Sequence, residues 1–189
     1  MENHNSTLLK AQFLIAMPGL LDPNFYHTVT CVCEHTNDGA LGIVVNRVHP
    51  SVSAKDIFRE LNIPSVSESD ELPVYIGGPV HMDEIFILHG PPFDWKGSFQ
   101  ISENLALSNT RDIIESISMG KGPSPVIIAV GCAGWGPGQL EAELGQNSWL
   151  TGPLSEEVIF KTPGDDRWGE AVKKLGIDPR LLSNTAGHA

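Results

Sequence analysis

Residues 28–46, TVTCVCEHTNDGALGIVVN, contain the clearest structural signal in the chain. Thr28–His35 alternates and is rich in β-branched residues, as β-strands are. Thr36–Gly39 contains an Asp-Gly pair, which supplies the positive φ that tight hairpin turns need. Leu41–Asn46 then returns as the second strand. The stretch therefore predicts a β-hairpin.

Hydrophobic patterns on both sides of this hairpin predict further strands and helices. Short apolar runs that end near turn residues predict strands over Phe13–Met17, Val74–Ile76, Ile85–His89, Ser98–Ile101 and Val126–Val130. Capping residues and helical spacing predict helices over Ser53–Asn62, Thr110–Met119, Asp166–Leu175 and from Pro137 or Gly138 to about Gly145. Strands that cluster in the first half, with helices interspersed, favour the α+β class.

The composition is that of an ordinary globular protein. The chain has 189 residues, of which 41% are hydrophobic and 19% charged, so it suits one domain with a buried core. Residues 1–9 lack the basic start and apolar stretch of an export signal, so we expect a flexible tail there and a single domain over residues 10–189. No apolar run approaches the roughly 20 residues that cross a bilayer, so we expect no membrane association.

Charge and cysteine content narrow the expected location and partners. The formal net charge is −11, and no basic stripe is visible. Direct nucleic-acid binding is therefore disfavoured, because phosphate backbones attract basic surfaces. The three cysteines cannot all pair within one chain, and Cys31 and Cys33 are poorly placed for a disulfide on one strand. With no export signal, this predicts a reducing, cytoplasmic location.

The order of short motifs resembles that of the AlgH/YqgE family of bacterial proteins. The matching stretches, which cover nearly the whole chain, are Phe13–Pro18, Asp22–Phe25, Thr28–Val29, Cys33–His35, Gly42–Arg47, Tyr75–Val80, Gly131, Gly134–Glu143 and Trp149–Leu150. The family usually has proline directly after the Asn-Arg pair, whereas here Val48 and His49 precede Pro50. Cys31 and Cys132 stand where aromatic residues are expected, so neither cysteine is given a family-wide role.

The resemblance implies a compact α+β fold with a bent, partly barrel-like, mostly antiparallel sheet and several flanking helices. It brings no established activity, cofactor or set of catalytic residues. Some family members are described as regulators of transcription, which is an association rather than a chemistry.

The most distinctive segment is Gly131–Gly138, which leads into Gln139 and Glu141. A glycine-rich loop before a helix can bind anions, but this spacing matches neither the dinucleotide fingerprint nor a P-loop, and Glu141 would repel a phosphate. We therefore predict a tight loop that anchors Trp135, with a ligand or partner surface as the alternative. The candidate surface consists of Gly131, Cys132, Gly134, Trp135, Gly136, Gln139 and Glu141, together with His35, Asn46 and Arg47.

Cysteine and histidine side chains offer two chemical alternatives. Cys132 could be a nucleophile near a helix start, but no local signature pairs it with a histidine, and we predict an unreactive residue. Cys31, Cys33 and His35 are expected to project from one face of their strand. That face could hold a metal, but the spacing does not match a zinc site, and we favour a plain core strand. No metal, cofactor or catalytic residue is therefore predicted.

Polar groups at the two ends of the hairpin could converge as a binding pocket. Glu34 and His35 lie at one end, and Asn46 and Arg47 lie at the other. The alternative is that they satisfy backbone groups at the turn and the strand ends. Gly77-Gly78-Pro79 is likewise predicted to shape the backbone at a bend.

The leading hypothesis is a non-enzymatic regulatory or interaction protein that senses a small ligand or contacts a protein partner. It follows from the absence of a recognisable catalytic constellation in the sequence. The rival hypothesis is an enzyme or redox protein with a pocket near Cys132, His35 and Arg47.

Overall fold

Strands and short helices follow one another in the computed structural model, which describes residues 9–182. The strands are β1 (Gln12–Ala16), β2 (Val29–Thr36), β3 (Gly39–Val44), β4 (Val74–Ile76), β5 (Val80–His89), β6 (Phe99–Ser102), β7 (Leu105–Ser108), β8 (Val126–Trp135) and β9 (Trp149–Pro153). The helices are α1 (Ala54–Glu60), α2 (Ser67–Asp70), α3 (Arg111–Ser118), α4 (Gln139–Gly145), α5 (Glu156–Phe160) and α6 (Arg167–Lys174), with 3₁₀ turns η1 (Gly164–Asp166) and η2 (Pro179–Leu181). Each helix in this part of the chain is too short or too polar to cross a membrane.

The nine strands found within residues 9–182 form one bent sheet in the order β6-β7-β5-β8-β3-β2-β1-β9, with β4 added beside β8. All neighbouring pairs are antiparallel except β4 and β8, which run parallel. The α+β class and the mostly antiparallel sheet are therefore confirmed. Over the described residues the sheet stays open rather than closing into a barrel, because β6 and β9 remain its edge strands.

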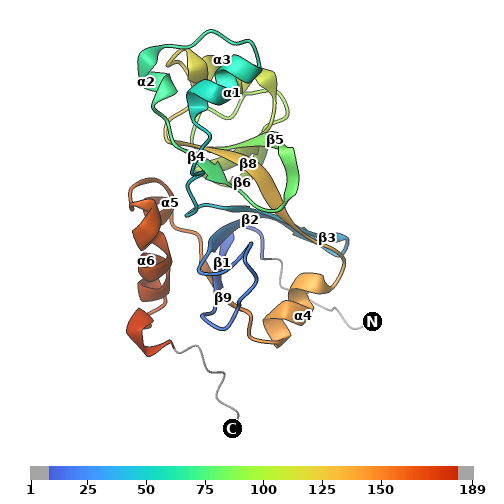
Figure 1. The fold of residues 1–189 in the computed structure, drawn as a ribbon. Coiled ribbons are helices and arrows are strands. Elements are labelled where there is room, and N and C mark those ends of the chain that lie inside the picture. The colour runs from blue at the N-terminus through green and yellow to red at the C-terminus, as the bar shows by residue number, and fades with distance from the viewer. Residues whose placement is uncertain (1–8, 183–189) are drawn as a thin grey trace.

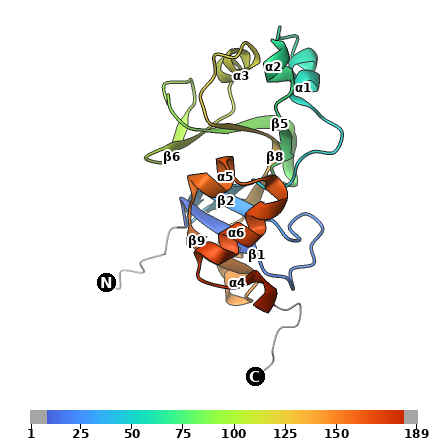
Figure 2. The ribbon, with the colours of Figure 1, turned by 90° about the vertical axis from the view of Figure 1, so that its left-hand side faces the viewer.

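Strand β8 joins the two halves of the molecule, as Figure 1 shows. Its first part pairs with β4 and β5 in the upper half of that view, and residues 133–135 pair with β3 in the lower half. Helices α1, α2 and α3 lie at the top of the upper half. Figure 2 shows α5 and α6 in front of β1 and β2 in the lower half.

The predicted hairpin is confirmed in β2 and β3. Thr36 pairs with Gly39 at its tip, so Asn37 and Asp38 form the turn within the predicted Thr36–Gly39 stretch. The positive φ, +133°, belongs to Gly39. A β-bulge shifts the register between Val32 and Glu34, which adds one unpaired residue, Cys33, to β2.

The glycine-rich segment that was predicted as a loop is largely strand. Residues 131–135 belong to β8, and only residues 136–138 lie between β8 and α4. Gly131 has a φ of +74°, and a Cβ there would lie 2.5 Å from the carbonyl oxygen of Gly78. A Cβ on Gly78, whose φ is +150°, would lie 2.2 Å from the carbonyl carbon of Cys132. The glycines thus let the turn between β4 and β5 pack directly on the β8 backbone, so the loop prediction was wrong and the backbone role predicted for Gly78 is confirmed.

Three clusters of buried side chains hold the helices on the sheet. The largest lies between the inner face of the bent sheet and helices α5 and α6, and it includes Phe13, Leu88 and Trp168. The second packs α1 and α3 against β4, β5 and β8. The third places α4 against β1, β2, β8 and β9, with Trp135 and Trp149 at its centre. Both halves therefore have a core, and the first cluster spans them.

Helix α1 begins where the capping signal predicts. Ser53 Oγ accepts the Asp56 N–H at 3.3 Å, and the Asp56 carboxylate accepts the Ser53 N–H at 2.9 Å. Strands β7 and β9 and helices α2 and α5 were not predicted. Residues 1–8 of the predicted tail lie outside the described residues, and Leu9 is buried.

Candidate functional site

The end of β8 and helix α4 meet in an aromatic cluster around one carboxylate. The indole N–H groups of Trp135 and Trp149 both donate to Glu143 Oε2, at 3.0 and 2.8 Å. The Phe25 ring stacks on Trp135 and meets Trp149 edge-on, with centroid separations of 5.9 and 5.5 Å. Because both tryptophans are buried, these rings fill a core rather than line a cage. Trp135 is the anchor that the sequence predicted.

Gln139 completes the short turn that precedes α4. Its Oε1 accepts the Gly136 N–H at 3.0 Å, and its Nε2 donates to Glu143 Oε1 at 3.0 Å. Glu141 lies in the first turn of the same helix. The start of α4 therefore uses its own side chains to satisfy a free N–H group and carries negative charge, which disfavours an anion there.

His35 connects three segments of the chain. Its Nδ1 accepts the Leu9 N–H at 3.1 Å, so its Nε2 carries the proton of the neutral ring and donates to Glu141 Oε1 at 2.8 Å. The imidazole is buried, whereas the Glu141 side chain is half exposed. His35 and Glu141 are thus two predicted site residues that the fold brings together, and both ring nitrogens are already engaged.

Cys31, Cys33 and His35 do not share one face of β2, contrary to the prediction. The bulge at Cys33 adds one residue, so the alternation of side chains reverses after it. Cys31 and Cys33 belong to the large cluster that α5 and α6 cover, whereas His35 contacts Glu141 on α4. Among residues 9–182, no three His, Cys, Asp or Glu side chains are grouped so that they could hold a metal.

All three cysteines are buried and unpaired. Burial raises the pKa of the Cys132 thiol to about 11, and the nearby Glu84 carboxylate and Cys33 thiol act in the same direction. The pKa of Cys33 is raised well above its ordinary value, first by its side-chain hydrogen bond with Cys31 and then by burial. A thiol that stays protonated is a poor nucleophile, so the raised pKa counts against catalysis by Cys132.

We expect native Cys132 to react with iodoacetamide at neutral pH about a hundredfold more slowly than a small free thiol, because two pKa units reduce the thiolate fraction by that factor. Rapid labelling of the folded protein would contradict the burial of this thiol.

The raised pKa of Cys132 also makes stability depend on pH. The pKa of this thiol is near its ordinary value of 9.0 in the unfolded chain and about 11 in the folded one. The protonated thiol therefore adds to the free energy of unfolding fully below about pH 9, and this contribution is lost as the pH rises towards 11. Urea unfolding between pH 7 and about pH 11 measures the loss, and Cys132→Ala should make it smaller. A pH dependence that is the same in the Cys132→Ala variant would contradict the raised pKa of this thiol.

Asn46 and Arg47 tie down the loop that precedes β2. Asn46 Oδ1 accepts the Val29 N–H at 2.8 Å, and its amide donates to the His27 carbonyl at 2.9 Å. The Arg47 guanidinium donates to three carbonyl oxygens within residues 23–26, at 2.9 to 3.1 Å. Both side chains therefore satisfy backbone groups, which was the simpler of the two expectations.

The three residues of the rival enzyme hypothesis each have separate surroundings. Cys132 lies in the large core cluster, His35 faces α4, and Arg47 holds the loop before β2. A nucleophile and its base need to lie within hydrogen-bonding reach. His35 and Arg47 are instead engaged with other partners, and neither bonds to Cys132.

Two adjoining pockets open where the hairpin meets the upper half of the molecule. One, of about 250 Å³, is lined by residues that include Glu34, Thr36, Asp38, Leu41 and Trp135. The other, of about 180 Å³, is lined by residues that include Glu34, Leu41, Phe86, Phe99, Leu107 and Asn109. The two pockets share Glu34 and Leu41, so they lie next to each other, and together we call them the seam groove.

The sequence indicated only part of the seam groove. Trp135 was a predicted site residue, and Glu34 was noted beside His35. Phe99 is on the edge strand β6 and is 37% exposed, which no local pattern revealed. Lys10, just before β1, places its Nζ 4.3 Å from the centroid of the Phe99 ring. This contact brings the start of β1 to the edge strand β6, beside the groove.

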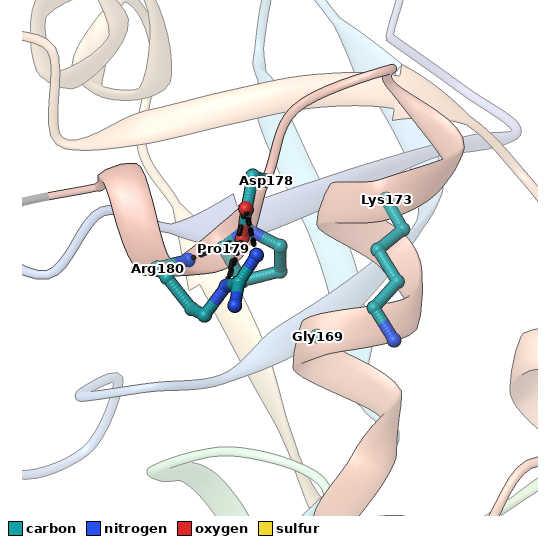
Figure 3. A pocket seen from close by; sticks show the side chains of 5 residues that line it. All are labelled: Gly169, Lys173, Asp178, Pro179 and Arg180. Atoms are coloured by element: carbon teal, nitrogen blue, oxygen red, sulfur yellow. Dashed lines mark hydrogen bonds and ion pairs between the residues drawn. The ribbon is translucent and has the colours of Figure 1, made fainter.

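A wider pocket of about 650 Å³ lies between α6 and η2, lined by Gly169, Lys173, Asp178, Pro179 and Arg180 (Figure 3). Its charged side chains are already paired, Arg180 with Asp178 at 2.7 Å and Lys173 with Glu170 at 2.6 Å. A ligand there would have to displace these partners, so the seam groove is the stronger candidate.

Comparisons with known proteins agree with the motif order. Residues 13–180 match the family described as DUF179, AlgH-like. A UPF0301 protein of Desulforapulum autotrophicum is 46% identical over 189 residues, covering 100% of both chains. Another, of Methylococcus capsulatus, is 48% identical over 188 residues, covering 98% of this chain and 99% of the relative.

Solved structures show the same relationship. The solution structure of the AlgH protein from Pseudomonas aeruginosa is similar with a TM-score of 0.81 and 38% identity, covering 100% of both chains. A crystal structure of a Corynebacterium diphtheriae protein shares the fold, with a TM-score of 0.70 and 22% identity, over 96% of this chain and 92% of the other. The resemblance drawn from the motifs is confirmed, and the chain belongs to the AlgH-like family.

Proposed function

We propose that this protein is a non-catalytic binding protein that receives a segment of a partner protein in the seam groove. The observation that carries the proposal is the size of the two adjoining pockets, about 250 and 180 Å³. Sites for small molecules are usually clefts or cavities of about 300–1,000 Å³, larger than either pocket alone. Two smaller, open pockets side by side suit successive side chains of a protein segment better than one enclosed metabolite.

The surroundings of the polar candidates support a binding role over catalysis. Cys132 is buried with a raised pKa, and both ring nitrogens of His35 have partners. The seam groove itself presents carboxylates and apolar side chains, including Glu34 and Phe99, which can recognise a partner without chemical change.

If this protein regulates transcription, we propose that it does so by binding another protein and not by binding DNA. With a net charge of −11, the chain would repel a nucleic acid backbone, so any effect on transcription would pass through a bound protein. We assign the protein to the cytoplasm, where reducing conditions suit three free cysteines.

Amide chemical shifts of isotope-labelled protein test this proposal. We expect the protein fraction of a lysate from the source bacterium, prepared from a strain that lacks the gene, to shift resonances of residues that line the seam groove. The small-molecule filtrate of the same lysate should shift none of them. Phe99→Ala removes one wall of the groove and should weaken the effect.

Met119→Ala is the matched control, since Met119 is 41% exposed and follows α3 at the top of the molecule. It should leave the shifts unchanged. The proposal fails if the filtrate causes the shifts, if they cluster at the pocket between α6 and η2, or if both variants weaken them equally.

A further inference from the structure

The seam groove has an apolar side that the β-strands supply. Phe86, Leu107 and Phe99 come from β5, β7 and β6, and Leu41 faces them from β3. Phe99 is 37% exposed although it lies on an edge strand. Apolar side chains of a partner would gain free energy by leaving water here, at roughly 25 cal/mol per Å² buried.

Carboxylates stand at the hairpin end of this apolar side, and two more line a neighbouring pocket. Glu34 and Asp38 line the pocket at the hairpin tip. A further pocket of about 340 Å³ shares Asn109 with the seam groove and is lined by Asp83 and Glu84. Its apolar lining, Leu61, Ile85 and Ile114, belongs to the second cluster, so this pocket lies on the other face of β5 and borders the groove without continuing it. Negative groups therefore line the groove at the hairpin tip and stand close to it near Asn109.

Most of these carboxylates are available to a partner. Within residues 9–182, Glu34, Asp38 and Asp83 take part in no ion pair, and Glu84 contacts only His81, at 3.4 Å.

Two cations lie at the three pockets. Lys10 stacks on Phe99 beside the seam groove. Arg111 lines the third pocket and is paired with Glu115 at 2.6 Å. The neighbourhood keeps an excess of negative charge, in keeping with the −11 of the whole chain.

We infer that the occupant of the seam groove is an extended protein segment in which Lys or Arg residues separate apolar ones. This inference rests on the proposed function and specifies its partner. Apolar side chains enter the two pockets of the groove, and the long basic side chains reach the carboxylates at the hairpin tip and those beside Asn109. Charge complementarity of this kind orients a partner and speeds its association.

Fluorescence anisotropy with a labelled peptide tests the inference. The probe is the blocked peptide Lys-Leu-Lys-Phe-Lys-Leu-Lys, and the comparison peptides carry Glu for Lys or Ser for the apolar residues. We expect only the first to bind, with Kd below about 100 μM at low salt, and more weakly as salt rises. The double variant Glu34→Lys, Asp38→Lys should weaken binding about tenfold.

Glu60→Lys, Glu71→Lys is the matched control, because it changes the net charge equally at exposed positions at the end of α1 and just after α2. It should alter Kd by less than about twofold. The inference is overturned if the control weakens binding as much, if spermidine competes as well as the peptide, or if the Ser peptide binds equally.

The chemical-shift experiment with the lysate, repeated on both groove variants, distinguishes the proposed function from the inference about the partner's charge. If Phe99→Ala abolishes the chemical-shift changes caused by the lysate while the double charge reversal does not, the groove is the docking site but its partner is not basic. Loss of binding in both variants supports both proposals, and loss in neither contradicts both.

Discussion

Gly78→Ala is expected to lower the melting temperature by about 10 °C or more, the equivalent of about 4 kcal/mol in a chain of this length. The new Cβ would lie 2.2 Å from the Cys132 carbonyl carbon and 2.4 Å from the Ala133 nitrogen, so it would overlap main-chain atoms of β8. The φ of +150° adds strain for any L side chain. Because β8 pairs with strands in both halves, its backbone has little freedom to move away.

Gly134→Ala is the matched control for this prediction. Gly134 lies on the same strand, but its φ is not in the left-handed region, and the nearest atom to a Cβ at this position would be a Val80 methyl group at 3.7 Å. Thermal unfolding followed by circular dichroism should place this variant within about 2 °C of the parent. Equal melting temperatures for the two variants would contradict the close backbone packing at Gly78.

Arg167→Met is expected to cost about 3 kcal/mol, which corresponds to a drop in melting temperature of roughly 6–12 °C. Arg167 is only 5% exposed, and its guanidinium donates to the carbonyl oxygens of Thr162, at 2.9 Å, and of Val45. It also lies over the Tyr75 ring, with Cζ 5.1 Å from the centroid. Methionine can fill much of the space but donates no hydrogen bond, so two carbonyl groups lose their partner.

Arg111→Met provides the comparison, since it removes an exposed arginine that is paired with Glu115 along one helix. Such pairs contribute only about 0.3–0.5 kcal/mol. Urea unfolding of both variants separates the two cases. A cost for Arg167→Met as small as that for Arg111→Met would show that the bond from the buried guanidinium to Val45, just after β3, does not stabilise the fold.

Local chemistry explains which elements could be predicted from the sequence. The hairpin was predictable because the Asp38-Gly39 pair and the flanking β-branched residues all lie within 19 consecutive residues. Helix α1 was predictable because Ser53 and Asp56 satisfy each other across a single turn. Such signals do not depend on the rest of the fold.

The incorrect predictions depended on contacts between distant residues. Gly131 looks like a loop residue, because a glycine that permits a turn and one that permits close backbone packing look the same in sequence. The bulge at Cys33 turns the His35 side chain to the opposite face of β2, and no residue type in the sequence indicates a bulge there. The seam groove combines residues from the hairpin with residues from β5 to β7, so its existence follows from the bend of the sheet.

The path of β8 also determines the order in which the protein can fold during synthesis. β3 near residue 42, and β4 and β5 near residues 74–89, are all complete before their shared neighbour at residues 126–135 has been made. Until that strand leaves the ribosome, both halves have an exposed strand edge that can pair with other chains. The contacts that close the two halves are long-range in sequence, and such topologies fold slowly. The nascent chain is therefore most prone to aggregation shortly before its last third emerges.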